Sequence, residues 1–469
     1  TVIPGNTTGT LTVTGNAVFH NGSSYQVGAT PQGQSSRIVV GGTASILGGS
    51  VLVLGQPGNY APRTDYTILT AAQGLSGQFG AVSANLTFLT PVLSYTANAV
   101  NLSLQRNDVS FESVANTSNQ KNTAGALEHL DPNSPLYDAL LTLDPATARH
   151  AFDQLSGEMH GSIGTALFDD SHYVRDAINN HLLGASYGGQ NAEGATGSGN
   201  IVWSSLWGHW GDHDSDGNAH DMNANGSGVL VGADTAIDDL RVGGLVGHGQ
   251  NSLNVRELGS TAHAKANYAG LYASWNLGNI RLRGGAAYAW QKIDTTRRIA
   301  FGTYSGVTQA NYDANTAQAY IDGSYVFQLD RATVEPYLNL SQVHVRTDAF
   351  TEHGSDAALA VDGSSSNLTV ATAGVRGSLQ LGPGGLHAYA GVGYQHASGD
   401  RVPERRQRFA AGADDFTVYG LPVADNAGVL DLGLRFPVGH AVTIDLGYHG
   451  QFASDAHDQS ARLTVNVAF

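Results

Sequence analysis

The sequence contains no cysteine, and only 13% of its 469 residues are charged. Soluble globular proteins carry roughly 25% charged residues. Because it has no cysteine, the chain uses no disulfide framework. The absence of thiols is compatible with a bacterial surface protein that crosses the oxidising periplasm unfolded.

Basic residues are also few, at 23 against 39 acidic ones, which gives a formal net charge of −16. Nucleic-acid binding needs a basic stripe, and none is present, so we expect no nucleic-acid partner. No apolar run reaches the roughly 18 residues of a transmembrane helix. The chain opens at Thr1 in polar, strand-like sequence rather than in a signal peptide, which indicates a mature or truncated chain.

Glycine is abundant instead, at 60 residues, and apolar residues make up 41%. This composition rules out wholesale disorder and fits a β-rich chain in which many side chains face neither water nor a compact core. The sequence pattern changes twice along the chain. We therefore expect three regions, residues 1–107, 108–200 and 201–469.

Residues 1–107 are rich in Thr, Val, Gly and Asn. Short strand-like segments such as residues 10–14 and 50–54 alternate polar and apolar side chains. Their spacing of roughly one to two dozen residues predicts a β-solenoid, in which successive coils stack on each other. A β-sandwich is the alternative interpretation.

Residues 108–200 have a helical period. Asp144 and Pro145 form a helix start, and a second helix is predicted over residues 162–183, with Gly184 as its C-cap. Residues 188–200 read as a flexible linker. The second helix is polar over most of its circumference, so it must be solvated or lie in a polar cavity. Its polar residues are Asp169, Asp170, Arg175, Asp176, Asn179 and Asn180.

Residues 201–469 carry the strongest pattern, in which strand after strand alternates apolar with other side chains. Over residues 280–290 an apolar face opposes a face with two arginines, and the last strand ends on Phe469. We predict about twelve strands, with connections that alternate short and long as in transmembrane β-barrels. The predicted short connections are residues 238–239, 276–279, 329–330, 382–385 and 437–439; the longer ones are residues 212–225, 251–261, 294–312, 347–364, 399–424 and 453–458.

A membrane barrel and a lipocalin-like soluble barrel are both compatible with alternating strands. The even strand count, the aromatic strand ends and the terminal Phe favour the closed membrane barrel. The aromatic residues assigned to membrane interfaces are Trp203, Trp207, Trp210, Tyr272, Trp275, Tyr288, Trp290, Tyr394 and Tyr448. The polar residues predicted to face the lumen are Arg281, Arg283, Asp431, Arg435, Asp445 and Arg462.

The second predicted helix is the natural occupant of this lumen, because a helix is about 10–12 Å across and would nearly fill a narrow barrel. We expect it to run from the solenoid through the lumen to the first strand. Its carboxylates Asp169, Asp170 and Asp176 would then meet arginines of the barrel wall, among Arg281, Arg283, Arg435 and Arg462.

Several segments, taken in order, resemble type Va autotransporters of Gram-negative bacteria. Residues 59–79 resemble the autochaperone end of a passenger β-helix. Residues 152–158 (FDQLSGE) and 170–176 (DSHYVRD) resemble the junction before the barrel, and residues 207–212 (WGHWGD) resemble the first barrel strand. The junction and first strand look closest to autotransporters with subtilisin-like passengers. The terminal residues Leu463, Val465, Val467 and Phe469 are similar to the signal that the barrel-assembly machinery reads.

This resemblance implies a translocator in the cell outer membrane that exports its own N-terminal passenger to the cell surface by type V secretion. Residues 59–104 would nucleate folding of the stem outside. The implied partners are outer-membrane lipid and lipopolysaccharide, the barrel-assembly machinery and periplasmic chaperones, and we expect a monomer. Any protease would lie upstream of Thr1, so we expect no catalytic residue and no cofactor in this chain.

Two other functions compete with export. A porin-like passive channel with a surface domain would leave the lumen open. An outer-membrane hydrolase would need a nucleophile and a base within hydrogen-bond reach, and no motif indicates one.

Four smaller signals remain. Asp212, Asp214 and Asp216 are spaced like the first half of a calcium loop, but Asn223 replaces the glutamate at position twelve, which favours a solvated turn. His209 and His213 are expected on a strand end and a loop, exposed or interfacial, and no metal site is expected. The loop with Arg401, Arg405, Arg406 and Arg408 is either solvated, where it meets lipopolysaccharide phosphates, or folded over the lumen mouth. By the same resemblance, Asn179-Asn180 is a candidate for self-cleavage, with ordinary helix-surface asparagines as the alternative.

Overall fold

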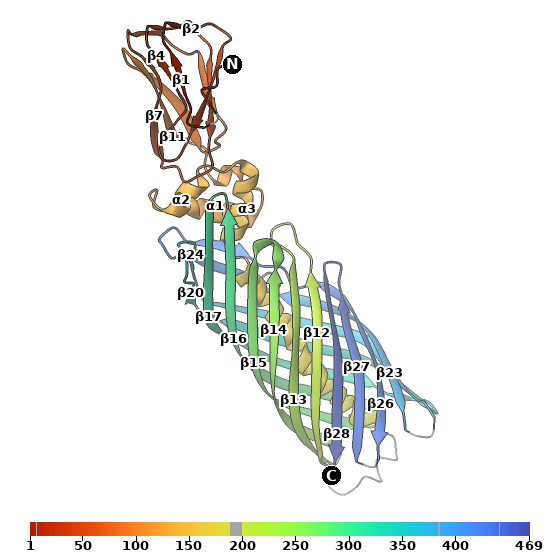
Figure 1. Cartoon of the computed structure of the whole chain (residues 1–469). Helices are drawn as coiled ribbons and strands as arrows, with labels where there is room; N and C mark the ends of the chain where they lie inside the picture. Colours follow the sequence, from red (N-terminus) through yellow and green to blue (C-terminus); the bar gives the residue numbers. More distant parts are fainter. Residues whose placement is uncertain (6, 188–198, 383–384, 440) are drawn as a thin grey trace.

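The computed structural model describes the whole chain except residues 6, 188–198, 383–384 and 440. It is elongated, with a β-stem at the N-terminal end, a small group of helices below it, and a long barrel that ends at the C-terminus (Figure 1). One long helix lies inside the barrel along its axis. The predicted linker, residues 188–200, falls mostly outside the described residues.

The stem consists of short parallel strands stacked in three sheets. Each turn of the chain contributes one strand to each sheet, so Thr10 lies opposite Arg37, and Ser24 opposite Ser50. This stacking is the geometry of a β-solenoid. The strands of the three sheets are β1 (Thr10–Val13), β4 (Arg37–Val40) and β7 (Arg63–Ala71); β2 (Ala17–Phe19), β5 (Ala44–Ile46) and β8 (Leu75–Gly77); and β3 (Ser24–Ala29), β6 (Ser50–Gly55) and β9 (Ala81–Ala84).

The stem core is a column of β-branched and aromatic side chains, including the fully buried Tyr25, Val27, Val51 and Ile68. An antiparallel hairpin of β10 (Leu89–Tyr95) and β11 (Ala99–Arg106) closes the column, because β11 pairs with β7 in the opposite direction. The sheet of β1, β4 and β7 therefore does not end in an open parallel edge at β7.

Three short helices follow the 3₁₀ turn η1 (Glu112–Val114): α1 (Ser118–Glu128), α2 (Pro135–Leu140) and α3 (Pro145–Ser156). Each begins at a polar N-cap, namely Thr117, Ser134 and Asp144, whose side chain accepts from a backbone N–H of the first turn. The start at Asp144 and Pro145 confirms the prediction, whereas α1 and α2 were not predicted. No described helix is both long and apolar enough to span a membrane.

The long helix α4 (Met159–Tyr187) extends beyond the predicted residues 162–183 at both ends. Gly184 is not its C-cap, because the helix continues through it. A Cβ atom at Gly184 would lie 2.6 Å from the Arg435 guanidinium carbon. Gly184 therefore leaves room for this arginine against the helix backbone.

The barrel is closed. Its strands form one antiparallel sheet in which the first strand pairs with the last and β17 pairs directly with β19, leaving twelve long strands around the wall. The strands are β12 (Ile201–His213), β13 (Met222–Ile237), β14 (Leu240–Val255), β15 (Ser260–Leu277), β16 (Ile280–Phe301), β17 (Tyr304–Tyr325), the two-residue β18 (Phe327–Gln328), β19 (Ala332–Thr347), β22 (Ser364–Gln380), β23 (His387–Gly399), β26 (Asn426–Val438), β27 (Val442–Phe452) and β28 (Ala456–Ala468).

The outer face of the barrel wall carries large apolar side chains and the inner face carries charged ones, as a barrel in lipid requires. Large apolar side chains such as Leu206, Leu271 and Leu338 are exposed on the outside, while charged groups such as Arg283 and Glu335 are buried inside. A lipocalin-like barrel has the reverse arrangement, with an apolar interior. The faces therefore match a membrane barrel.

Four of the six predicted longer connections are shorter than predicted, and three of these four are short turns. Residues 302–303 alone join β16 to β17, where residues 294–312 were expected to form a loop; the connections near residues 212–225, 251–261 and 453–458 are also shorter than predicted. The outward apolar stripe of β16 ends at Trp290, and its next exposed residues are Lys292 and Asp294. The strands nevertheless continue, because water tolerates a polar outer face while Ile293 and Phe301 are buried on the inner side. The end of the stripe marks the edge of the lipid, not the end of the strand.

The other two connections fold into a small sheet that we call the lid, made of β20 (Phe350–Thr351), β21 (Leu359–Val361), β24 (Glu404–Phe409) and β25 (Phe416–Tyr419). It packs against α1 and α4. Arg405 is buried in it, and its Nε donates to the His160 carbonyl at 2.9 Å, whereas Arg406 and Arg408 pair with Asp415 on the surface. The loop with these arginines was expected to be either solvated or folded over the lumen mouth. The second interpretation is confirmed.

Two glycines set the contact between the lid and α4. A Cβ at Gly420 would lie 2.2 Å from the Ser162 nitrogen, and one at Gly161 would lie 2.6 Å from the Gly420 nitrogen, so the backbones touch. We expect Gly420→Val to detach the lid from α4 by overpacking, at a cost of about 1–3 kcal/mol. Limited proteolysis of residues 400–425 in detergent should show faster cleavage. Gly125→Ala, at a helix position with open space, is the control and should leave cleavage unchanged.

Candidate functional site: the helix in the barrel lumen

Helix α4 runs through the lumen from the mouth towards the opposite end, where β12 begins (Figure 1). It is less polar than predicted. Its first half packs Ile163 and Leu167 in one apolar cluster with wall residues, and its second half packs Val174 and Ile178 in another. A cavity of about 90 Å³ remains beside residues 175–183.

The carboxylates of α4 meet histidines and an amide of the wall, not arginines as predicted. Asp169 Oδ2 lies 2.9 Å from His213 Nε2. Asp170 accepts from Asn251 at 2.9 and 3.0 Å, and its Oδ1 lies 3.7 Å from His209 Nε2. The helix cation Arg175 donates to Gln318 at 3.1 Å.

Further along α4, a second group joins the helix to the last strands. His172 Nδ1 lies 2.7 Å from Asp176 Oδ2, and His172 Nε2 lies 2.9 Å from Asp458 Oδ2 of β28. His449 of β27 lies 3.6 Å from Asp176 and 2.8 Å from Asp431. Asp431, a predicted lumen residue, thus orients a histidine.

Near the C-terminal end of α4, His181 Nε2 lies 2.5 Å from Asp234, and its ring stacks on Trp203 with centroids 4.9 Å apart. Trp203 donates to the Tyr272 hydroxyl, which donates to Asp234. Trp203, Trp207 and Tyr272 were assigned to the membrane interface, but all three are buried in the lumen. Of the remaining aromatic assignments, Trp210, Trp275, Tyr288, Trp290 and Tyr394 lie exposed on the outer face, and Tyr448 is partly exposed.

The predicted lumen arginines pair within the wall. Arg283 lies 3.0 Å from Asp322 and 2.9 Å from Glu335 on neighbouring strands. Arg435 pairs with Asp445 at 2.7 Å and donates to the Asn180 carbonyl at 3.3 Å. Arg462 reaches the Tyr389 hydroxyl at 3.4 Å and Asp445 at 4.0 Å, and Arg281 is half-buried on the face of Arg283. These ion pairs of the arginines are therefore with carboxylates of the wall, and Arg435 also contacts the helix backbone.

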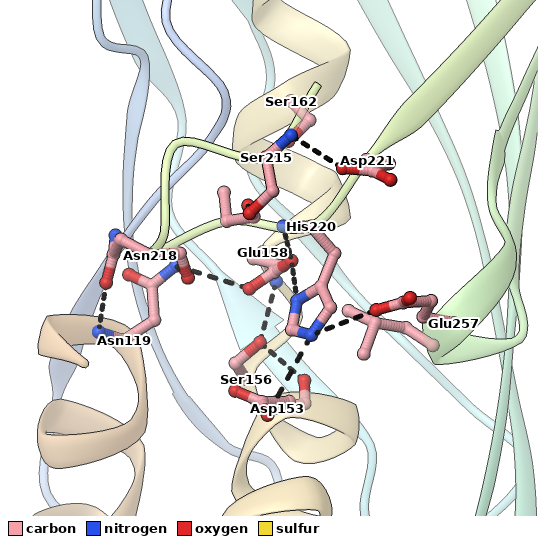
Figure 2. A network of polar contacts seen from close by, with 12 residues as sticks. Asn119, Asp153, Ser156, Glu158, Ser162, Ser215, Asn218, His220, Asp221 and Glu257 are labelled. Carbon is pink, nitrogen blue, oxygen red and sulfur yellow. Dashed lines mark hydrogen bonds and ion pairs between the residues drawn. The ribbon is translucent and has the colours of Figure 1, made fainter. Parts of the chain in front are cut away.

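At the mouth, a polar network joins the junction helices to the β12–β13 connection (Figure 2). The His220 backbone N–H donates to Glu158 at 2.7 Å, and its Nδ1 lies 2.9 Å from the same oxygen. Its Nε2 faces Asp153 at 3.9 Å and Glu257 at 3.7 Å. Asn119 donates its backbone N–H to Asn218 at 2.8 Å. The network fixes α1, α3 and α4 on the rim.

This rim lies outside the lipid, and two of its side chains, His220 and Asp153, have shifted pKa values. The hydrogen bond to Glu158 raises the pKa of His220 to about 9, and burial raises the pKa of Asp153 to about 6. A histidine with a raised folded-state pKa stabilises the protein fully below its unfolded value of about 6.5, and this contribution is lost as the pH rises through 9. Asp153 is already ionised above pH 7, so the window from pH 7 to 9.5 isolates His220.

We therefore expect the docking of α3 and α4 on the rim to weaken by about 2 kcal/mol between pH 7 and 9.5. Hydrogen exchange in residues 145–165 measures this loss of docking free energy. His220→Gln should abolish the pH dependence, and His20→Gln, at an exposed stem position, should retain it. Equal pH dependence in all three proteins would contradict this assignment.

The remaining sequence signals have plain structural roles. Asp216 and Asp221 accept backbone N–H groups of their own loop, which favours the solvated turn over a calcium site. Asn179 lines the cavity, and the Asn180 amide donates to the Asp176 carbonyl at 2.8 Å, as expected for ordinary helix asparagines. Leu463, Val465, Val467 and Phe469 share the outer face of β28 and its end.

A model of the autotransporter β-domain family matches residues 202–449, which is more than half of the chain. The chain belongs to the autotransporter β-domain family. Two curated relatives, both extracellular serine proteases of Serratia marcescens, are 30% and 29% identical over 100% and 99% of the chain. The chain spans about half the length of these relatives, at 50% and 49%.

Solved structures of autotransporter translocators resemble the barrel. The translocator domain of NalP from Neisseria meningitidis is 17% identical, with a TM-score of 0.49 over 65% of this chain and 99% of that one. The transport unit of AIDA-I from Escherichia coli is 16% identical, with a TM-score of 0.45 over 57% and 90%. By its family, this chain is an autotransporter translocator unit, and its barrel is inserted in the outer membrane.

Proposed function

We propose that this autotransporter unit exports an N-terminal passenger through its lumen and displays residues 1–107 at the cell surface. One observation carries the proposal: α4 connects the junction at the mouth with β12, which starts at the opposite end of the barrel. A chain that enters β12 from that end reaches the stem only by passing through the lumen. Export of the N-terminal part across the barrel produces this arrangement.

The filled lumen favours this function over the porin-like channel. Apolar clusters and buried ion pairs hold α4 along its length, and the cavity beside it has a volume of only about 90 Å³. A passive channel needs a continuous wide path. A translocator whose transport is complete has none.

An epitope placed ahead of Thr1 tests export. Antibody staining of intact Gram-negative cells should detect it for the full chain. The control is a chain that ends at residue 441 and lacks β27 and β28, which cannot close the barrel and should give no surface signal. An epitope of the full chain that stays inside the outer membrane would refute the proposal.

We also propose that the passenger of the complete protein is a serine protease, which rests on the names of the two Serratia relatives. The proposed partners are outer-membrane lipid and lipopolysaccharide around the wall, periplasmic chaperones in transit, and the barrel-assembly machinery at the C-terminal strand. We propose a monomer, since the barrel closes on itself through β12 and β28.

The exposed end residue Phe469 tests the assembly partner. Its side chain lies outside the folded lumen, so its loss should leave the detergent-refolded barrel intact while reducing membrane insertion in cells. Deletion of Phe469 should lower the amount of heat-modifiable barrel in outer membranes several-fold. Val231→Ala, at another exposed wall position, is the control and should insert normally.

A further inference from the structure

We infer that His172, Asp176 and His449 form a binding site for a divalent transition-metal ion such as Zn²⁺, which fastens the lumen helix to the barrel wall. One ligand atom from each residue lies within 4.8 Å of the others. His172 and Asp176 are four residues apart on α4 and share one face of the helix, while His449 comes from β27. The site therefore joins the lumen helix α4 to strand β27 of the barrel wall.

The donor atoms suit such an ion. Imidazole nitrogen and carboxylate oxygen bind Zn²⁺ at about 2.0–2.2 Å, so neighbouring ligand atoms of a tetrahedral site lie about 3.3 Å apart. Asp176 Oδ2 lies 2.7 Å from His172 Nδ1 and 3.6 Å from His449 Nε2. Shifts of less than about 1 Å in these side chains would bring the three atoms to the required spacing.

The second nitrogen of each histidine is already oriented. His172 Nε2 lies 2.9 Å from Asp458, and His449 Nδ1 lies 2.8 Å from Asp431. A carboxylate on the far nitrogen of a ligating histidine fixes the ring and its tautomer and raises its basicity at the metal. Both imidazoles thus direct their remaining nitrogens to the same point beside Asp176. The three carboxylates around them supply negative charge for a cation.

An open position lies next to these ligands. The cavity of about 90 Å³ is lined by Asp176, His449 and Gln451, which leaves space for water as a further ligand. The Gln451 amide nitrogen lies 3.3 Å from His449 Nε2 and must turn aside when a metal binds. Arg175 also lines this cavity, where its guanidinium donates to Gln318 at 3.1 Å and attracts the Asp176 carboxylate.

Titration of the refolded full chain in detergent, first stripped with EDTA, tests the site with Zn²⁺ and Co²⁺ as probes. We expect one ion per chain, and a visible Co²⁺ absorption band typical of a site with fewer than six ligands. His449→Gln should weaken Zn²⁺ binding more than about 100-fold. Asp431→Asn, which only loses the orienting contact, should weaken it by about 10- to 100-fold.

His213→Gln is the matched control, because it also removes a buried lumen histidine that pairs with an α4 carboxylate. It should bind Zn²⁺ like the parent chain. Heat-modifiable migration on gels confirms that each variant barrel is folded. Absence of saturable binding to the folded parent chain, or equal binding by His449→Gln, would overturn the site.

Discussion

A barrel that begins at residue 199, without α4, is expected to conduct ions at least about tenfold better in a planar bilayer than the full chain. Helix α4 occupies a cylinder about 10–12 Å wide, and its removal exposes an equally wide aqueous path lined by charged side chains. Among the described residues, a cavity of about 90 Å³ lies beside the helix in the full chain. Single-channel recording compares the two directly.

A chain that begins at residue 108 is the control for this deletion. It lacks the stem but keeps the junction helices and α4, so it should conduct as poorly as the full chain. High conductance of the full chain itself would contradict the filled lumen and support the porin-like alternative. High conductance of the control alone would show that the stem, not α4, blocks the path.

The second large effect is expected at Glu352, which is buried between the lid and the barrel wall. It binds Arg297 through both oxygens, at 2.7 and 2.6 Å, lies 2.8 Å from His160 of α4, and accepts the Leu359 N–H. The Arg297 and Glu352 side chains are only 1% and 0% exposed. Glu352→Gln leaves the guanidinium buried without its counter-charge, which typically costs about 3–5 kcal/mol.

Hydrogen exchange in the lid strands measures this cost, and exchange at least about a hundredfold faster is expected. The double variant Glu352→Gln with Arg297→Met should regain much of the protection, because no uncompensated charge remains. Asp65→Asn in the stem removes an ion pair whose partners are 65% and 60% exposed, and should change exchange little. Normal exchange in Glu352→Gln would contradict the assigned role.

The architecture was predictable because its signals are local. Period-two alternation identified the closed barrel of twelve long strands, and the helical period of residues 162–183 with its charged residues identified the lumen helix. Both features follow from which face of an element meets lipid, water or a polar interior. The prediction that α4 lies in the lumen combined the polar circumference of this helix with the width of a helix.

The pairing inside the lumen was not predictable in the same way. His209 and His213 were placed on a strand end and a loop, yet β12 runs to His213, and residues four apart on a strand share a face as they do on a helix. Both therefore point at α4 with Trp203 and Trp207. The strand continued past the point where the outward apolar stripe ended. The misjudged end of β12 hid the histidine partners of Asp169 and Asp170, and the same kind of error at other strands produced the other wrong loops.

The central claim, that the stem lies outside the cell and is reached through the barrel, is tested most directly by labelling single cysteines on intact cells. The native chain has none, so each introduced thiol reports one position. Leu47→Cys, at an exposed stem position, should react with a membrane-impermeant maleimide on intact cells. Asp330→Cys, in a turn at the other end of the barrel, should react only after the outer membrane is permeabilised. Labelling of Asp330→Cys but not Leu47→Cys on intact cells would contradict the account.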